Sequence, residues 1–187
     1  MSVVPEARIS STVRIASLVG NPRPQSRTHG LARTLAEQIA RALGSGGVAE
    51  VDLTPFGPRV LDPADEPVTE AVGEVLAADV LVVASPTYKA AYSGLLKGFL
   101  DRFATGSLAG TAAVPVLLGG APGHRLAVDV HFTPLLLELG AAVPVRGLFV
   151  LEAEVADFGA VAAAWADAHA PVLLAASRAK TQALATS

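Results

Sequence analysis

Short apolar runs alternate along the chain with longer stretches of helical periodicity, and this alternation restricts the possible folds more than any other feature of the sequence. The run at residues 79–85 is short and almost continuously apolar, as is typical of a parallel strand covered on both faces. Predicted strands occupy residues 12–20, 48–53, 79–85, 112–120 and 141–152. Predicted helices occupy residues 31–43, 63–78, 93–103 and 123–140, and the rest of the chain is also predicted to be helical.

Five strand–helix units predict an α/β fold in which helices cover both faces of a five-stranded parallel sheet. The natural topology for this number of units is the flavodoxin-like three-layer sandwich with strand order 2-1-3-4-5. We expect one such domain over residues 13–187, preceded by a loose segment at residues 1–12. Sheets of this kind bind ligands beyond the carboxyl ends of their strands, so the loops after the first, third and fourth strands are the places to search.

Composition excludes several classes of function. The 187 residues carry a formal net charge of −3 with mixed signs, which gives no electrostatic reason to expect nucleic acid or an anionic membrane as a partner. Cysteine is absent, so disulfides, thiolate nucleophiles and cysteine-bound clusters are excluded. The N-terminal residues lack a long apolar core and are not expected to form a signal peptide. The alanine-rich residues 158–176 are interrupted by Asp167, His169 and Pro171, which favours helices over a membrane span.

The first loop, residues 20–29, has the composition of a phosphate site. Arg23 and Arg27 supply planar cationic groups, Ser26 and Thr28 supply hydroxyls, and a predicted helix begins directly afterwards. The glycine spacing matches neither a dinucleotide fingerprint nor a P-loop. An ordinary capped loop, with Thr28 as the N-cap and solvated arginines, explains this segment equally well on its own.

The second and third loops have the composition of a site for a flat ring. Pro86 stiffens the turn that carries both tyrosines of the chain, and Gly94 permits close backbone approach. Gly119 and Gly120 directly follow the fourth predicted strand and leave a surface without side chains, although such a pair is more often a simple turn. Taken together, the three loops predict a mononucleotide site, and FMN is the leading candidate on this topology.

These segments resemble the NADPH-dependent FMN reductases, especially the flavin reductases of two-component alkanesulfonate monooxygenase systems. The resemblance covers residues 13–152. The stretch GNPRPQSRT (20–28) is similar to the family's phosphate loop, usually written G-S-P-R-x-x-S-R, with Asn21 in place of the serine. SPTYKAAYSGLLKGFLD (85–101) is similar to the loop that holds the isoalloxazine, and GGAPGHRLAVDVHFTPLL (119–136) is similar to the third loop and its helix.

The resemblance implies hydride transfer from NADPH, or from NADH, to FMN, with no side chain serving as a proton-transfer catalyst. It further implies a cytoplasmic homodimer or homotetramer that supplies reduced flavin to a monooxygenase. The phosphate contacts that it implies are Asn21, Arg23, Ser26, Arg27 and Thr28. The ring contacts that it implies are Pro86, Thr87, Tyr88, Lys89 and Gly94 on one side and Gly119, Gly120 and His124 on the other.

Pro134 lies inside the fourth predicted helix and cannot donate a hydrogen bond to the carbonyl of Val130, so a kink or bulge is expected there. Members of the family from sulfur-scavenging systems carry a one-residue insertion in this helix that forms a π-bulge at the subunit interface. The resemblance implies the same here, with Val130 or His131 as the additional residue and His131 at an interface near the flavin. A proline-kinked helix with a solvated or packed histidine is the alternative.

The sequence argues against some alternative functions more strongly than against others. A flavodoxin-type electron carrier is usually strongly acidic, unlike this chain, whereas a quinone or azo-dye reductase using bound FMN is poorly separated by sequence from a flavin reductase. A serine hydrolase lacks support because no G-x-S-x-G motif is present. The four histidines show no metal-ligand spacing, so no metal site is predicted.

Overall fold

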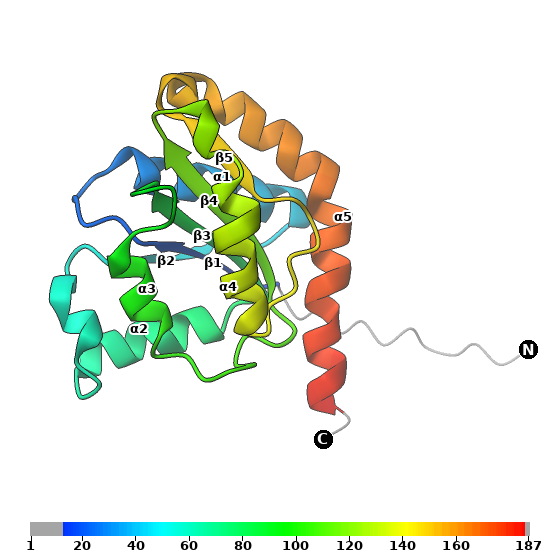
Figure 1. The fold of residues 1–187 in the computed structure, drawn as a ribbon. Coiled ribbons are helices and arrows are strands. Elements are labelled where there is room, and N and C mark those ends of the chain that lie inside the picture. Colours follow the sequence, from blue (N-terminus) through cyan, green and yellow to red (C-terminus); the bar gives the residue numbers. More distant parts are fainter. Residues whose placement is uncertain (1–12, 186–187) are drawn as a thin grey trace, which may run out of the picture.

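Five parallel strands form one sheet in the order β2-β1-β3-β4-β5 (Figure 1), which confirms the predicted topology. The computed structural model describes residues 13–185, and of residues 178–185 it describes the backbone only. The predicted loose segment at residues 1–12 lies outside the described residues. The strands are β1 Ile15–Val19, β2 Val48–Asp52, β3 Val80–Pro86, β4 Ala112–Gly119 and β5 Leu148–Leu151.

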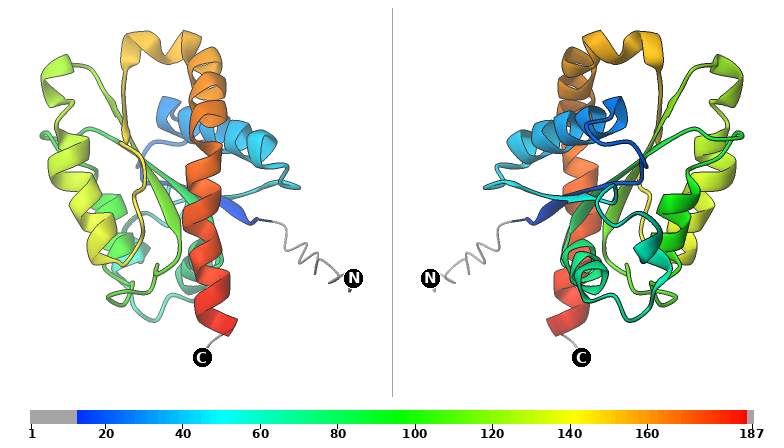
Figure 2. Two further views of the ribbon diagram at one scale, coloured as in Figure 1. Left: turned by 90° about the vertical axis from the view of Figure 1, so that its right-hand side faces the viewer. Right: turned by 90° about the vertical axis from the view of Figure 1, so that its left-hand side faces the viewer.

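Helices cover both faces of the sheet, as the two opposite views in Figure 2, each turned by 90° from Figure 1, show. Helices α1 and α5 pack on one face, and α2, α3 and α4 pack on the other. Strands β3 and β4, in the centre of the sheet, are buried along their whole length because both faces are covered. The helices are α1 Arg27–Leu43, α2 Glu66–Leu76, α3 Gly94–Leu100, α4 Thr133–Glu138 and α5 Phe158–Ala185.

Helix α1 begins four residues before the predicted start at Leu31, because the side chain of Ser26 accepts a hydrogen bond from the backbone N–H of His29 and so caps the first turn. The interpretation of Thr28 as the N-cap is therefore wrong, since Thr28 is already helical. Gly44 ends the helix as predicted, in the left-handed conformation with φ 64°. The helix thus extends into the first loop and brings Arg27 into its first turn.

The fourth predicted helix is divided into three pieces. A short 3-10 helix, Pro122–His124, is followed by a π-helix, Val128–Phe132, and then by α4. The π-helix confirms the predicted bulge just before Pro134. The Arg146 guanidinium holds this turn from outside, with its Nη2 at 2.6 Å from Oδ2 of Asp129.

The last strand is shorter than the predicted 141–152. Within residues 141–147 there is only an isolated bridge between Ala112 and Ala142, and β5 begins at Leu148. Gly147 packs so closely that a Cβ there would lie 2.4 Å from Val128 and 2.6 Å from Pro115. The chain therefore crosses beside the π-helix before it joins the sheet.

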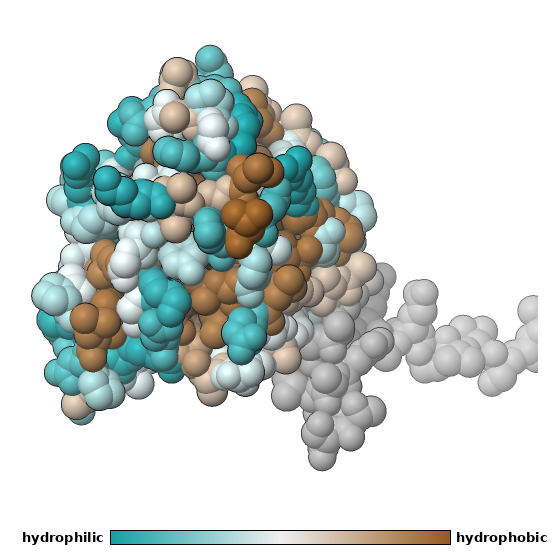
Figure 3. All heavy atoms as spheres, viewed as in Figure 1, coloured by the Kyte–Doolittle hydropathy of each residue, from teal (hydrophilic) through white to brown (hydrophobic). Residues whose placement is uncertain are grey.

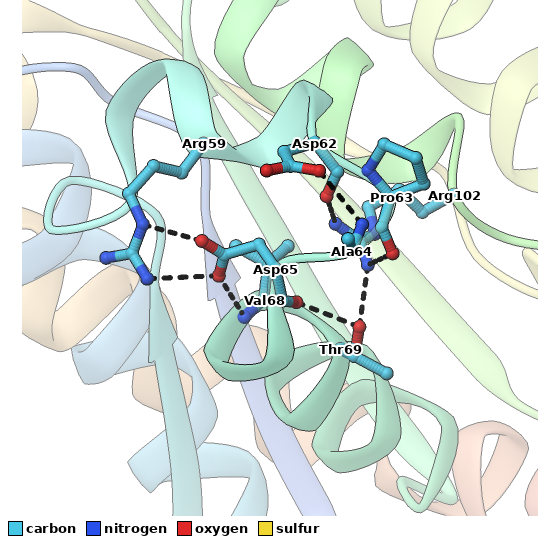
Figure 4. Close-up of polar contacts among 8 residues, drawn as sticks. All are labelled: Arg59, Asp62, Pro63, Ala64, Asp65, Val68, Thr69 and Arg102. Carbon is cyan, nitrogen blue, oxygen red and sulfur yellow. Dashed lines mark hydrogen bonds and ion pairs between the residues drawn. The ribbon is translucent and has the colours of Figure 1, made fainter.

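The second connection is more structured than predicted. A 3-10 helix, Gly57–Leu61, precedes α2, which begins only at Glu66 because Asp65 is its N-cap. Figure 4 shows the polar network that holds this connection: Arg59 forms two hydrogen bonds to the Asp65 carboxylate, and Arg102 binds the Asp62 and Pro63 carbonyls and the Thr69 hydroxyl. The network links the β2–α2 connection to the end of α3.

One segment of the described chain, residues 152–177, is long and apolar enough to cross a membrane by length and hydropathy alone. This segment contains most of α5, whose buried residues Ala162, Ala166 and Leu173 pack in the core beside α1. Although only 28% of its most apolar window is buried in the domain, a single such helix is weak evidence for a membrane span.

Candidate flavin site

A cavity of about 320 Å³ lies at the carboxyl ends of the strands, where the loops after β1, β3 and β4 meet. Its position at the junction between β1 and β3 is the point at which the strand order reverses, as expected for this topology. The lining residues are Asn21, Arg23, Pro24, Gln25, Ser26, Arg27, Thr28, Pro86, Thr87, Tyr88, Leu118, Gly119, Gly120 and Glu152.

The first loop is held open by internal hydrogen bonds. The Asn21 side chain is buried; its Nδ2 donates to Oγ1 of Thr28 at 3.0 Å, and its Oδ1 accepts from the backbone N–H of Arg23 at 3.0 Å. The Thr54 hydroxyl donates to the Asn21 carbonyl from the neighbouring β2 connection. Asn21 and Thr28 therefore brace the loop, and the side chains of Arg23 and Arg27 remain on the cavity wall.

The second loop is joined to the first through Ser93. The Ser93 hydroxyl donates to the Gly20 carbonyl and accepts from the backbone N–H of Leu96, which caps α3. The backbone N–H of Ser93 in turn donates to Oγ of Ser85 at 2.8 Å, where the loop leaves β3. Both serines are buried, so this network fixes both ends of the segment 85–93 against the end of β1.

A tight turn presents Tyr88 at the cavity rim. Tyr88 and Ala91 exchange two backbone hydrogen bonds, and the central residues Lys89 and Ala90 have φ of 50° and 61°. Two consecutive positive φ values are typical of a hairpin turn that usually contains asparagine or glycine. Lysine and alanine in these positions are strained, and such strain concentrates at functional sites.

The two glycines after β4 differ in their surroundings. A Cβ on Gly119 would lie 2.5 Å from the Phe149 ring and 3.1 Å from Oγ1 of Thr87, so close packing requires glycine there. A Cβ on Gly120 would meet no atom within 4 Å, although the residue lines the cavity. The absent side chain at Gly120 therefore leaves space that a flat ligand can occupy.

Ten of the thirteen predicted site residues line this cavity, and Lys89, Gly94 and His124 do not. Lys89 and His124 are exposed, and Gly94 lines a separate, more apolar pocket beside Leu61 and Leu95. Their assignment as flavin contacts stays a prediction.

Four lining residues were missed by sequence reasoning: Pro24, Gln25, Leu118 and Glu152. Pro24 and Gln25 lie inside the quoted phosphate loop, and Leu118 immediately precedes Gly119. Glu152 has no local signal, since it reaches the cavity only because β5 lies next to β4. Its carboxylate forms an ion pair with Arg27, with Oε2 at 2.8 Å from Nη2.

The π-helix contacts the second loop through a pair of aromatic rings. The Phe132 ring, fully buried, lies 5.4 Å from the Tyr92 ring. His131 is exposed on the same turn. Within the described residues, no cluster of three or more histidine and carboxylate side chains has the geometry to hold a metal ion.

Comparison with known proteins matches this fold and site to one family. The sequence model of the family described as NADPH-dependent FMN reductase matches residues 13–156. The chain is 37% identical over 152 residues to "FMN reductase (NADPH)" of Escherichia coli (strain K12), covering 78% of this chain and 77% of that protein. It is 32% identical over 145 residues to "NADH-dependent FMN reductase SfnF" of Pseudomonas putida, covering 75% and 78%.

Among solved structures, the apo form of an NADH:FMN oxidoreductase superposes with a TM-score of 0.74 at 32% identity, covering 83% of this chain and 89% of that one. The match of the family model to most of the chain, together with two relatives more than 30% identical, leads to one conclusion. The chain belongs to the NADPH-dependent FMN reductase family.

Proposed function

We propose that this protein is an NAD(P)H-dependent FMN reductase, an oxidoreductase that uses a nicotinamide nucleotide to reduce FMN. The observation that carries the proposal is the cavity at the β1–β3 junction, which combines a cationic loop at a helix N-terminus with a surface free of side chains. Relatives named for NADPH and for NADH both support the family's chemistry, so the proposal includes either nucleotide.

The residues present fit FMN by their chemistry. Arg23, Arg27 and the capped first turn of α1 supply the charge and N–H donors that a phosphate monoester requires. The segment at Thr87 and Tyr88 and the open space at Gly120 suit a flat heteroaromatic ring. FMN, when bound, supplies the hydride-accepting chemistry, and the protein supplies binding and orientation.

A turnover assay tests the proposal. Purified protein is mixed with NADPH or NADH and excess FMN, FAD or riboflavin, and oxidation of the nicotinamide is followed by absorbance. Oxidation in proportion to free FMN is expected for a flavin reductase. Slow oxidation that free flavin does not stimulate, but that a quinone does, would replace the proposal with a quinone or azo reductase using bound FMN.

The remaining alternative is a non-enzymatic electron carrier. It predicts tight FMN binding with no nicotinamide oxidation at any flavin concentration. The same assay therefore separates all three functions, because each predicts a different dependence on free flavin and on the electron acceptor.

We further propose that the protein is cytoplasmic, has no membrane partner and delivers reduced FMN to a monooxygenase of a sulfur-scavenging system. The relatives named SfnF and SfnE support the link to a two-component system.

Assembly into a homodimer or homotetramer is supported by exposed apolar side chains around α4 and the π-helix, where Val130 and Leu137 are 56% and 53% exposed. Figure 3, which shows the face that carries α4, displays apolar surface over this region.

A further inference from the structure

Glu152 places a negative charge in a cavity whose other charged side chains are positive. Three charged residues line the cavity, namely Arg23, Arg27 and Glu152. Glu152 directly follows β5 and pairs with Arg27 across 125 positions of sequence. Because Glu152 cancels one arginine, the lining retains one net positive charge toward a phosphate monoester that carries nearly two negative charges at neutral pH.

The two arginines are not equivalent. Arg27 is the first residue of α1 and already has a carboxylate partner at 2.8 Å. Arg23 forms no ion pair with any residue in the described part of the chain. A phosphate in the loop would therefore meet Arg23 unpaired, whereas it would have to compete with Glu152 for Arg27.

The ion pair between Arg27 and Glu152 is weak enough for a phosphate to replace Glu152 as the partner of Arg27. The two side chains are 57% and 48% exposed, and an ion pair with this exposure is weak and screened by salt. A second pair, Arg41–Asp167, joins α1 to α5 at 2.7 Å with similar exposure but lies away from the cavity lining. Arg41–Asp167 is therefore an ion pair of α1 with similar exposure in which no cavity residue takes part.

We infer that Glu152 is a specificity-determining residue that weakens the binding of phosphate-bearing flavins by competing with the phosphate for Arg27. The inference rests on the proposed function, because it takes the flavin phosphate as the anion in this loop. A competing carboxylate raises the dissociation rate of FMN and reduces the preference of the cavity for FMN over riboflavin, which has no phosphate. Fast release is what a reductase requires when its reduced flavin must leave for a second protein.

The test compares Glu152→Gln with the matched control Asp167→Asn, each of which removes one carboxylate charge from an α1 ion pair. Flavin fluorescence titrations give Kd for FMN and for riboflavin at low and at high salt. For Glu152→Gln we expect the Kd of FMN to fall about fivefold at low ionic strength, with the Kd of riboflavin unchanged. The gain should largely disappear at about 0.5 M salt, and Asp167→Asn should match the wild type for both flavins.

The possible outcomes separate clearly. An FMN-to-riboflavin affinity ratio in Glu152→Gln equal to that of Asp167→Asn would overturn the inference. Weaker FMN binding in Glu152→Gln would also overturn it, since Glu152 would then orient Arg27 for the phosphate instead of competing with it. Absence of flavin binding by the wild type would instead reject the proposed function itself. Thermal unfolding of each variant checks that the fold is retained.

Discussion

Ser93 shows how one hydroxyl can organise a binding site. It caps α3 through the N–H of Leu96 and donates to the carbonyl of Gly20, which is where β1 enters the phosphate loop. A buried hydroxyl with both a donor and an acceptor partner contributes to stability, and each buried group left unpaired by its loss adds a further cost. The same contact joins two of the three loops that line the cavity.

Ser93→Ala should lower the free energy of unfolding by about 1–3 kcal/mol, because it removes an N-cap and leaves the buried Gly20 carbonyl without its donor. We also expect weaker FMN binding, since the two loops lose their link. Chemical denaturation and a flavin titration measure the two effects. Ser107→Ala is the matched control, because the buried Ser107 hydroxyl has no partner among the described residues and its loss should be nearly neutral. Equal losses in the two variants would contradict this role for Ser93.

At the scale of single elements, α2 depends on the charge of its N-cap. The Asp65 carboxylate accepts hydrogen bonds from Arg59 and from the backbone N–H of Val68. The hydrogen-bonded Arg59 guanidinium is the main cause that holds the pKa of Asp65 below its ordinary value of 3.8. A carboxylate with a lowered folded-state pKa stabilises the fold above its unfolded pKa, and this contribution is lost as the pH falls through the folded pKa.

Asp65→Asn should therefore reduce the pH dependence of stability on the acid side. Asparagine remains a good N-cap, so the helix keeps its first-turn hydrogen bond while the titrating charge is lost. We expect the wild type to lose more stability than Asp65→Asn as the pH falls below about 4, as measured by denaturant unfolding at a series of pH values. Arg59→Gln should also make the free energy of unfolding less dependent on pH in this acidic range. Parallel losses in wild type and Asp65→Asn would show that another group is responsible.

At the scale of the whole molecule, the π-helix connects the exposed apolar face to the site. Val130 and His131 are exposed on this turn, whereas Phe132 on the same turn is buried against Tyr92 of the second loop. A structural change on this exposed face can therefore be transmitted to the cavity through the contact between the Phe132 and Tyr92 rings. The extra residue of a π-turn also rotates the side chains that precede it relative to those of α4.

Deletion of His131 should convert the π-turn toward a regular helix and alter both subunit association and flavin binding. The proposal that this turn lies at a subunit interface beside the flavin site predicts a change in oligomeric state by analytical ultracentrifugation and a weaker retention of FMN. His131→Ala keeps the chain length and serves as the control for the imidazole alone. If the deletion leaves both oligomeric state and flavin retention unchanged, the proposal is wrong.

The sequence by itself determined the topology, because apolar runs of strand length separated by helical periodicity admit few arrangements once crossovers must be right-handed. It also determined most of the cavity, since Arg23, Arg27, Thr87 and Gly120 sit in loops that the strand order brings together. The bulge before Pro134 was predictable for a local reason, because proline has no backbone N–H to donate to the preceding turn.

Only the tertiary structure decided which of several possible local contacts form and which residues distant in sequence meet. Ser26, and not Thr28, caps α1, and the Thr28 hydroxyl instead accepts a hydrogen bond from the Asn21 side chain. Strand β5 begins only at Leu148, directly after Gly147 packs closely against Val128 and Pro115. Glu152 and Arg27 meet across the cavity, because all five parallel strands end on the same side of the sheet and Glu152 directly follows β5. Local sequence carries no signal for such a pair, since the approach of the two charges is set by packing across the whole sheet.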